Sequence, residues 1–516
     1  FGCADEDYPG VYTRISALCD WIESYVELVP APNVPPSPPV PPPLPNFPRA
    51  LQSAEWSGSR SDGHLTATEL TTILQHIQLT FPDSCKLYSI GTSVNGEPLW
   101  VLQLSHDVWM DNDKPEIRYI ANMHGDEVTG RVLTLKFIQW LLQERDERAT
   151  QLMANSIIHI LVSMNPDGFE NNLRNNANNV DLNRDFPDVF EPSFTSQPET
   201  NAVMEWTRSR RFVLSANFHD GAQGVVNYPY DRHSDISISG TPSLTPDHDE
   251  FVSLATTFAN ECEPALGALY PADLTANGIT NGAAWYSIRG SMQDWQYRER
   301  GSFSVTVEVS ASKSETWDNS MNVEWPRFKE GMIAFATKVL ETLHVRVFDG
   351  TTGRPAVNAA LRVVGREDTV SYANAYGSIY RPLAPGTHQL NISTPARINR
   401  LVMVNVESGV RPIVNVTVYL DDTPMVRATA GDVLTSYQPC CSASESCWVN
   451  LDEYQLDPDC TSDADCTPRR TCILRSDGVR RHCVLAEPMT LPTPPPSAPL
   501  AVNPPPPPVR PLEAPP

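Results

Sequence analysis

The stretch Ile117-Arg-Tyr-Ile-Ala-Asn-Met-His124-Gly-Asp-Glu127 decides the fold of this chain. An apolar run ends in a histidine and a glutamate three residues apart, and apolar residues then recur at helical spacing from Val128 to Leu142. The pattern predicts a strand, a turn and a helix. His124 and Glu127 can converge on one side of such a turn, and both are good zinc ligands. Because His-x-x-Glu is a common pattern and two ligands do not make a site, the chain must supply a third.

Helical and strand-like runs alternate from about residue 55 to residue 343. Helical patterns cover Thr68–Leu79 and Val128–Glu147. Runs rich in β-favouring residues predict strands at Cys85–Ile90, Trp100–Leu104, Ile117–Ala121, Ile157–Met164, Phe212–Phe218 and Phe303–Val309. This alternation predicts an α/β fold, in which a mixed, mostly parallel sheet is flanked by helices on both faces. Ligands of such folds bind at the carboxyl edge of the sheet.

Two further polar residues lie at the ends of predicted strands. His219 follows the strand at 212–218, and Glu308 lies near the end of the strand at 303–309. Taken alone, His219 is most simply interpreted as a buried histidine at the end of a core strand. Glu308 alone is most simply interpreted as a carboxylate at the sheet edge. Together with His124 and Glu127 they make four candidates at one edge. Three can form a His/Glu/His zinc site with one position open for water, and the fourth can take that water's proton.

The segment Arg174-Asn-Asn-Ala-Asn-Asn-Val-Asp-Leu-Asn183-Arg184-Asp-Phe-Pro-Asp resembles the DLNR-x-FPD signature of zinc metallocarboxypeptidases. It is most similar to the subfamily that contains carboxypeptidases E, N, M and D. Further matching pieces, in the expected order between residues 55 and 340, are NMHGDE, SMNPDGFE, NYPYD, NGAAWYSIRGSMQDW and TVEVS. The resemblance implies the zinc carboxypeptidase fold and a hydrolase that works as an exopeptidase.

The resemblance also implies the roles of the four candidates. His124, Glu127 and His219 take the positions of the zinc ligands, which implies one Zn²⁺ in the catalytic domain. Glu308 takes the position of the catalytic glutamate, which acts first as general base and then as general acid.

Four more positions match residues that contact substrate in this family. Arg174, Asn183 and Arg184 fall where the terminal carboxylate is bound, and a guanidinium offers a fork of donors that suits a carboxylate. Arg184 or a nearby arginine would also polarise the scissile carbonyl, so Arg174 is counted among the catalytic residues. Tyr286, which lies before Glu308 by the family's spacing, matches the mobile tyrosine that closes over substrate.

Preference for a basic C-terminal residue is implied by two positions. Asp231 matches the acidic partner of a basic substrate side chain, and Gln293 matches the floor of its pocket. The sequence departs from the family pattern nearby: the loop His219-Asp-Gly-Ala-Gln-Gly-Val-Val-Asn-Tyr-Pro is one residue longer than usual. Ser291 replaces a usual glycine, and Arg289 replaces a usual proline. A positive charge at Arg289 would oppose a cationic substrate if it pointed into the pocket.

After about residue 343 apolar and polar residues alternate with a period of two, which is typical of β-strands. Short alternating strands separated by turns predict a small all-β sandwich at residues 343–422. It resembles the transthyretin-like domain that follows the catalytic domain in the E/N/M/D subfamily. We expect it to pack against a catalytic domain at residues 51–342.

The remaining segments are predicted from composition and resemblance. Residues 1–28 (FGCADEDYPGVYTR…) resemble the C-terminal end of a chymotrypsin-like serine protease, without the members of a Ser-His-Asp triad. Residues 29–50 form a proline-rich linker of extended polyproline character. Residues 423–486 form a cysteine-rich module, and residues 487–516 form a proline-rich disordered tail.

Cysteine usage favours a secreted, extracellular protein. Seven of the eleven cysteines fall within the cysteine-rich module, a density typical of disulfide bonds, and Cys85 could pair with Cys262. The sequons Asn391-Ile-Ser and Asn415-Val-Thr fit a glycoprotein. A start at Phe1, without methionine or signal peptide, suggests a fragment or a processed product. The proline-rich segments suggest association with an extracellular matrix or wall.

Charge and length narrow the classes of function. The 516 residues predict two or three cores, and the 48 prolines cluster in linkers and tails. A net charge of −24 argues against nucleic acid as a partner. The sequence contains no run of 18 or more apolar residues, so we expect no membrane-spanning helix.

The sequence therefore predicts a zinc metallocarboxypeptidase, a protease that releases the C-terminal residue, Lys or Arg, from peptides or proteins. Alternatives are a catalytically inactive binding module of the same family, a same-fold amidohydrolase of small N-acyl amino acids, and a structural wall protein. An inactive relative would be expected to lack a ligand or the base. An amidohydrolase would be expected to lack the residues for a terminal carboxylate.

Overall fold

The computed structural model describes most of the central part of the chain. The described residues are 58–407, with gaps at 111, 144–145, 192–195, 223, 267–275, 351 and 395–398, and the strands 413–418, 425–428, 447–450, 470–474 and 481–485. The segments predicted at 1–28, 29–50 and 487–516, and most of 423–486, lie outside the described residues.

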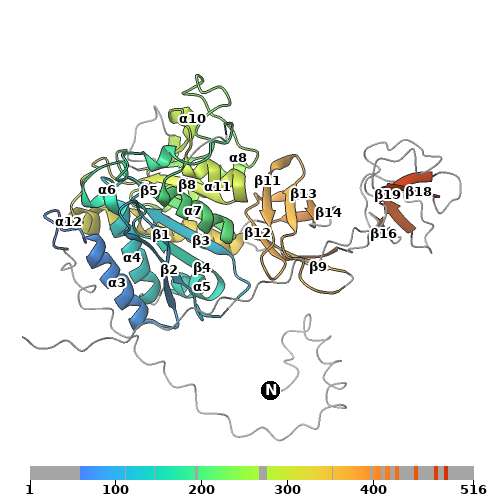
Figure 1. Cartoon of the computed structure of the whole chain (residues 1–516), viewed down its shortest axis with the longest axis horizontal. Helices are drawn as coiled ribbons and strands as arrows, with labels where there is room; N and C mark the ends of the chain where they lie inside the picture. Colours follow the sequence, from blue (N-terminus) through green and yellow to red (C-terminus); the bar gives the residue numbers. More distant parts are fainter. Residues whose placement is uncertain are drawn as a thin grey trace, which may run out of the picture.

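An eight-stranded mixed sheet forms the centre of the larger part of the molecule (Figure 1). Its strands are β1 (Cys85–Thr92), β2 (Pro98–Leu104), β3 (Glu116–Ala121), β4 (Ile157–Leu161), β5 (Phe212–His219), β6 (Val225–Tyr228), β7 (Ile279–Asn281) and β8 (Phe303–Glu308), in the order β1-β2-β4-β3-β5-β8-β6-β7. The four central strands β4, β3, β5 and β8 are parallel. Strand β1 pairs antiparallel with β2, β2 with β4 and β6 with β8, whereas β7 pairs parallel with β6. The predicted mixed sheet is therefore confirmed.

Helices cover both faces of this sheet, as predicted. The main helices are α3 (Ala67–Thr80), α4 (Thr129–Gln143), α5 (Glu147–Asn155), α7 (Pro198–Ser209), α8 (His248–Glu261), α11 (Met292–Arg300) and α13 (Trp325–Thr337). One apolar core packs the sheet against α3, α4, α5, α8 and α13, and a second packs it against α7 and α11. Strand β3 serves both cores, because alternate side chains of a strand point to opposite faces: Tyr119 faces the first core and Ile120 the second.

The helix predicted at Val128–Glu147 is two helices. Helix α4 ends at Gln143, and α5 begins at Glu147. The side chain of Asp146 accepts a hydrogen bond from the backbone N–H of Arg148 and so caps the start of α5. Continuous helical periodicity hid this boundary, because a capping aspartate inside a charged stretch resembles any other surface residue.

A second, all-β part follows the mixed sheet. A four-stranded sheet, in the order β11-β10-β13-β14, packs on a three-stranded sheet, in the order β12-β9-β15. The strands are β9 (Leu343–Asp349), β10 (Ala360–Val363), β11 (Arg366–Tyr372), β12 (Ser378–Arg381), β13 (Gly386–Ser393), β14 (Asn399–Val406) and β15 (Ile413–Val418). Inward side chains of β9, β10, β12, β13 and β14 form a separate apolar core. This sandwich, orange in Figure 1, lies against the larger part beside α8 and α11.

Two short ladders are described beyond the sandwich. They are β16 (Met425–Ala428) with β17 (Cys447–Asn450), and β18 (Arg470–Leu474) with β19 (Arg481–Leu485). None of the helices described here has the length and apolar character that a bilayer span requires.

One expectation about modification is wrong, the disulfide bond between Cys85 and Cys262. Cys85 and Cys262 are both buried free thiols. They lie apart because β1 is one edge of the sheet, whereas α8, which ends at Glu261, packs on β6 and β7 at the other edge. The sequon residue Asn391 lies in β13, which pairs on both sides, and its Oδ1 is buried. Asn391 itself is half-buried, and glycosylation at the two sequons stays a prediction.

Candidate metal and substrate site

The predicted metal ligands come from the carboxyl ends of neighbouring parallel strands. The turn between β3 and α4 carries His124 and Glu127, and His219 is the last residue of β5, which pairs directly with β3. Strand β8 pairs with β5 on the other side, and its register places Glu308 opposite His219. Parallel strands end at the same edge, so residues 181 positions apart in sequence meet in one place.

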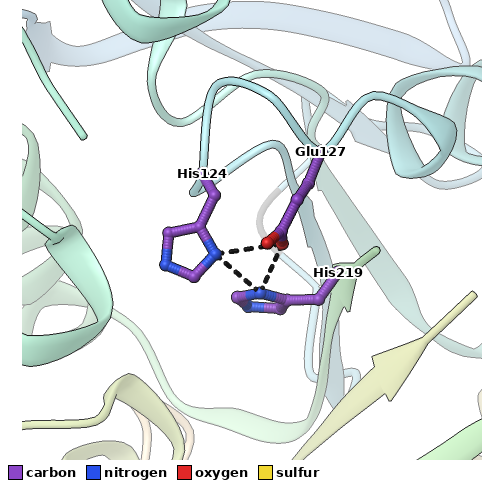
Figure 2. Close-up of side chains that lie close together, drawn as sticks. All are labelled: His124, Glu127 and His219. Atoms are coloured by element: carbon purple, nitrogen blue, oxygen red, sulfur yellow. Dashed lines mark hydrogen bonds and ion pairs between the residues drawn. The ribbon is translucent and has the colours of Figure 1, made fainter. Parts of the chain in front are cut away.

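Two imidazoles and one carboxylate converge at this edge, as Figure 2 shows. Nδ1 of His124 lies 3.0 Å from Oε2 of Glu127, Nδ1 of His219 lies 2.8 Å from the same oxygen, and the two Nδ1 atoms are 3.1 Å apart. All three residues are buried, and their ligand atoms lie within 4.8 Å of one another. Two histidine nitrogens and one carboxylate oxygen at this spacing fit one zinc ion with a coordination position left open.

The outer nitrogen of each imidazole is held by a neighbour. Nε2 of His124 lies 2.9 Å from Oδ1 of Asp181, and the side-chain amide of Asn217 lies 2.6 Å from Nε2 of His219. Oδ1 of Asp181 accepts from Nε2–H of His124, which fixes that ring and leaves its Nδ1 free to bind a metal, whereas Asn217 fixes the orientation of the His219 ring. Sequence reasoning missed both residues, although Asp181 is the first residue of the DLNR motif.

Glu127 is ionised by its surroundings. Burial alone would raise its pKa, but the two imidazoles lower the pKa of this carboxyl well below its usual range. Its second oxygen, Oε1, accepts from Nη1 of Arg174 at 3.0 Å and from Nζ of Lys313 at 2.6 Å. Lys313 was not predicted, because a lone lysine five residues after a strand carries no signal of its own.

Glu308 lies beside the metal ligands in an environment that favours its protonated form. Burial, followed by the negative charges of Glu127 and Asp220, raises the pKa of Glu308 well above the usual value for a glutamate. Asp220 was also missed: it is buried, and it accepts from the backbone N–H groups of Thr129 at 2.9 Å and Ser310 at 3.2 Å. A carboxyl with a raised pKa next to a metal site suits general base and acid chemistry.

A cavity of about 200 Å³ opens from the metal ligands. Its walls include the predicted catalytic residue Glu308 and most of the predicted substrate residues, namely Arg174, Asn183, Arg184, Asp231 and Tyr286. Tyr286 is 46% exposed, and it follows the short helix α10 (Gly282–Trp285). Gln293, on α11, does not line the cavity but lies behind Asp231.

Asp231 forms a buried negative group on the cavity wall. Its Oδ1 accepts from Nε2 of Gln293 at 2.8 Å and from Nδ2 of Asn227 at 3.2 Å. No cationic side chain among the described residues forms an ion pair with it. Gly282 permits this arrangement, because a Cβ there would lie 1.9 Å from that oxygen.

The departures from the family pattern do not disturb this pocket. The longer loop after His219 still brings Asp231 to the cavity wall. Arg289 turns away from the cavity, and its Nη1 donates to Oε2 of Glu191 at 2.8 Å. Ser291 is buried immediately before α11.

Fold and site together define a metal-dependent hydrolase with a His₂Glu centre at the carboxyl edge of an α/β sheet. The chain belongs to the zinc carboxypeptidase family (Peptidase_M14), whose sequence model matches residues 70–338. Members of this class are zinc-dependent hydrolases, which agrees with the predicted cofactor.

Individual relatives are also similar over most of the described region. The chain is 35% identical to carboxypeptidase D of Mus musculus over 383 residues, which cover 71% of this chain and 27% of that protein. It is 36% identical to carboxypeptidase M of Mus musculus over 373 residues, covering 66% of this chain and 81% of the relative. The crystal structure of thrombin activatable fibrinolysis inhibitor aligns with a TM-score of 0.47 and 19% identity, over 56% of this chain and 76% of that one. The matched region thus spans about a quarter of the length of carboxypeptidase D.

Proposed function

We propose that this protein is a zinc-dependent exopeptidase that removes the C-terminal residue, Lys or Arg by preference, from peptides or proteins. One observation carries the proposal: the His124, Glu127 and His219 cluster shares a single cavity with a buried carboxylate, Asp231, that lacks a cationic partner among the described residues. The family match and the carboxypeptidase relatives support the reaction class.

The residues that line the cavity would bind the metal and transfer protons. His124, Glu127 and His219 would hold zinc, which supplies Lewis acidity that polarises a carbonyl and makes water a stronger acid. Glu308 would take a proton from the attacking water and deliver it to the departing amine.

Recognition of the chain end falls to the cationic side of the cavity. Arg174, Asn183 and Arg184 line the wall and would bind the free terminal carboxylate, which restricts cleavage to the last peptide bond. Tyr286 is half exposed on the cavity wall and would close over a bound peptide.

Preference for a basic residue follows from the electrostatics of Asp231. The carboxylate of Asp231 is buried and held by neutral amide donors, so it has lost its water without forming an ion pair with any described residue. A lysine ammonium or an arginine guanidinium would supply that counterion. Gln293 would support the carboxylate from behind.

A matched peptide series tests the proposal. The full zinc-loaded chain is offered peptides that differ only in ending with Lys, Arg, Leu or Glu, together with C-terminally amidated copies, and released residues are measured by mass spectrometry. We expect release of Lys and Arg at least about tenfold faster than Leu, and no release from the amides or after chelation of zinc. In the variant Asp231→Asn the basic preference should disappear. No release from any peptide would overturn the proposal, and cleavage of N-acyl amino acids alone would indicate an amidohydrolase.

We further propose the domain boundaries of the protein and an extracellular location. A catalytic domain at 51–342 and a sandwich at 343–422 are supported by separate apolar cores, which divide between Val339 and Leu343. A secreted protein is supported by the cysteine density of residues 423–486. Association with an extracellular matrix through the proline-rich segments rests on composition.

A further inference from the structure

We propose that Asn122 is a positioning residue that shapes the metal-ligand turn before any metal binds. Its side-chain amide lies inside the turn that carries His124 and Glu127 and binds the backbone of both. The inference rests on the proposed assignment of these two residues as zinc ligands.

The amide nitrogen of Asn122 faces three backbone carbonyls. Nδ2 lies 3.0 Å from the oxygen of His124, 3.2 Å from that of Gly125 and 3.1 Å from that of Glu127. Asn122 is fully buried, so water cannot replace these bonds. One side chain therefore fixes the backbone at both proposed ligands and at a residue between them.

The opposite end of the amide is fixed as well. Oδ1 of Asn122 accepts from Oγ of Ser163 at 2.7 Å and from Nη1 of Arg131 at 3.4 Å. Nη1 of Arg131 also donates to Oγ of Ser163 at 2.9 Å, and its guanidinium lies over the ring of Phe169, 3.5 Å from the centroid. Because donors surround Oδ1 and carbonyls surround Nδ2, the amide has a single satisfied orientation.

The backbone conformation of Asn122 is a second reason for an asparagine at this position, distinct from the hydrogen bonds of its side chain. Its φ is 57°, a left-handed conformation that asparagine, aspartate and glycine tolerate better than other residues. If backbone conformation were the whole reason for Asn122, aspartate or glycine would serve equally well. If the amide donor matters, both replacements fail, because aspartate places an acceptor against three carbonyls and glycine leaves them unpaired.

The variants Asn122→Asp and Asn122→Gly test the proposal in the full-length protein. Zinc dissociation constants are measured by competition with a chromophoric chelator, and melting of the zinc-free protein is followed by circular dichroism. We expect both variants to bind zinc about 10- to 100-fold more weakly, as for residues that orient metal ligands. The matched controls are Asn358→Asp and Asn358→Gly, at an exposed asparagine of the sandwich with φ 61°, which should keep wild-type affinity.

Wild-type zinc affinity in both Asn122 variants would overturn the inference while leaving the proposed function intact. If neither variant folds, Ser163→Ala provides the test, since it removes the hydroxyl that orients the amide and leaves the turn sequence unchanged. A several-fold weaker zinc affinity is expected there, and unchanged affinity would overturn the inference. A wild-type protein that binds no zinc would instead refute the proposed function.

Discussion

Arg381 of the sandwich and Asp247 of the larger part form a fully buried ion pair, with 2.8 Å between Nη2 and Oδ2. Asp247 immediately precedes α8, and it also accepts from Nη1 of Arg366 at 3.0 Å and from Oη of Tyr297 at 2.8 Å. Tyr297 lies on α11, the helix that carries Gln293 behind the pocket carboxylate. The sandwich therefore packs on the larger part, as expected, and reaches the helix that supports the substrate pocket.

Replacing Arg381 by methionine should lower the free energy of unfolding by about 1.5–3 kcal/mol. The reason is that Asp247 would remain buried after losing two charge-assisted hydrogen bonds from Arg381 and would keep Arg366 as its cationic partner. Urea unfolding followed by tryptophan fluorescence measures the change.

The control for this prediction is a surface ion pair of similar length. Arg148 lies 2.6 Å from Glu330 but keeps 45% of its side chain exposed. Arg148→Met should therefore cost about 1 kcal/mol or less. Equal losses in the two variants would show that burial does not determine the strength of the interdomain pair.

Replacing Glu308 by glutamine should lower turnover by about 100- to 10,000-fold, the usual contribution of a general base. Zinc stoichiometry should stay near one per chain, because Glu308 is not among the three clustered ligands. Peptide-release rates and metal analysis of the same preparation give both quantities. Glu330→Gln, at the surface pair, should change neither, and full activity in the Glu308 variant would assign the base to another residue.

Binding of basic substrates should weaken in acid. Burial raises the pKa of Asp231, despite the amide hydrogen bonds and the charge of Arg184, so this carboxyl becomes neutral at a higher pH than an ordinary aspartate. A neutral acid no longer attracts a cation. KM for a peptide ending in Arg should therefore rise as pH falls through that pKa, whereas KM for the matching Leu peptide should change less. Parallel pH profiles for the two peptides would contradict the role of Asp231.

Stability should fall between pH 6.5 and about 4 because of His64. Burial lowers the pKa of this imidazole in the folded protein to about 4, whereas an unfolded histidine titrates near 6.5. Between these values the unfolded chain binds more protons, so the free energy of unfolding decreases with decreasing pH, by up to roughly 3 kcal/mol. Thermal melts across this range should show a shallower decline in His64→Gln. His76→Gln, at an exposed histidine, should follow the wild type, and an unchanged slope in the His64 variant would contradict the prediction.

The sequence predicted the elements better than their junctions. Strand β3 and the start of α4 follow from an apolar run and a helical period, which are local properties of the chain. The break between α4 and α5 does not, because it depends on the side chain of Asp146 folding back on Arg148 N–H. The suggested pairing of Cys85 with Cys262 failed for a related reason, since sequence alone does not place two cysteines within bonding distance.

The residues of the candidate site likewise fall into two groups, those that the sequence predicted and those that it missed. His124, Glu127, His219 and Glu308 were predicted because each follows a strand and matches a family motif. Lys313, Asp181, Asn217 and Asp220 were missed, because their importance lies in contacts with those residues rather than in any pattern of their own.

By itself the sequence determined six strands of the mixed sheet, although not β6 and β7, together with the type of each ligand and the family to which the chain belongs. Only the tertiary structure decided that Asp231 forms no ion pair with a cationic side chain of the described residues, that Arg289 turns away toward Glu191, and that the amide of Asn122 binds the backbone of the ligand turn. The physical reason is that hydrophobic periodicity and motifs are local properties of the sequence. Burial and charge pairing instead depend on which distant segments the sheet brings side by side.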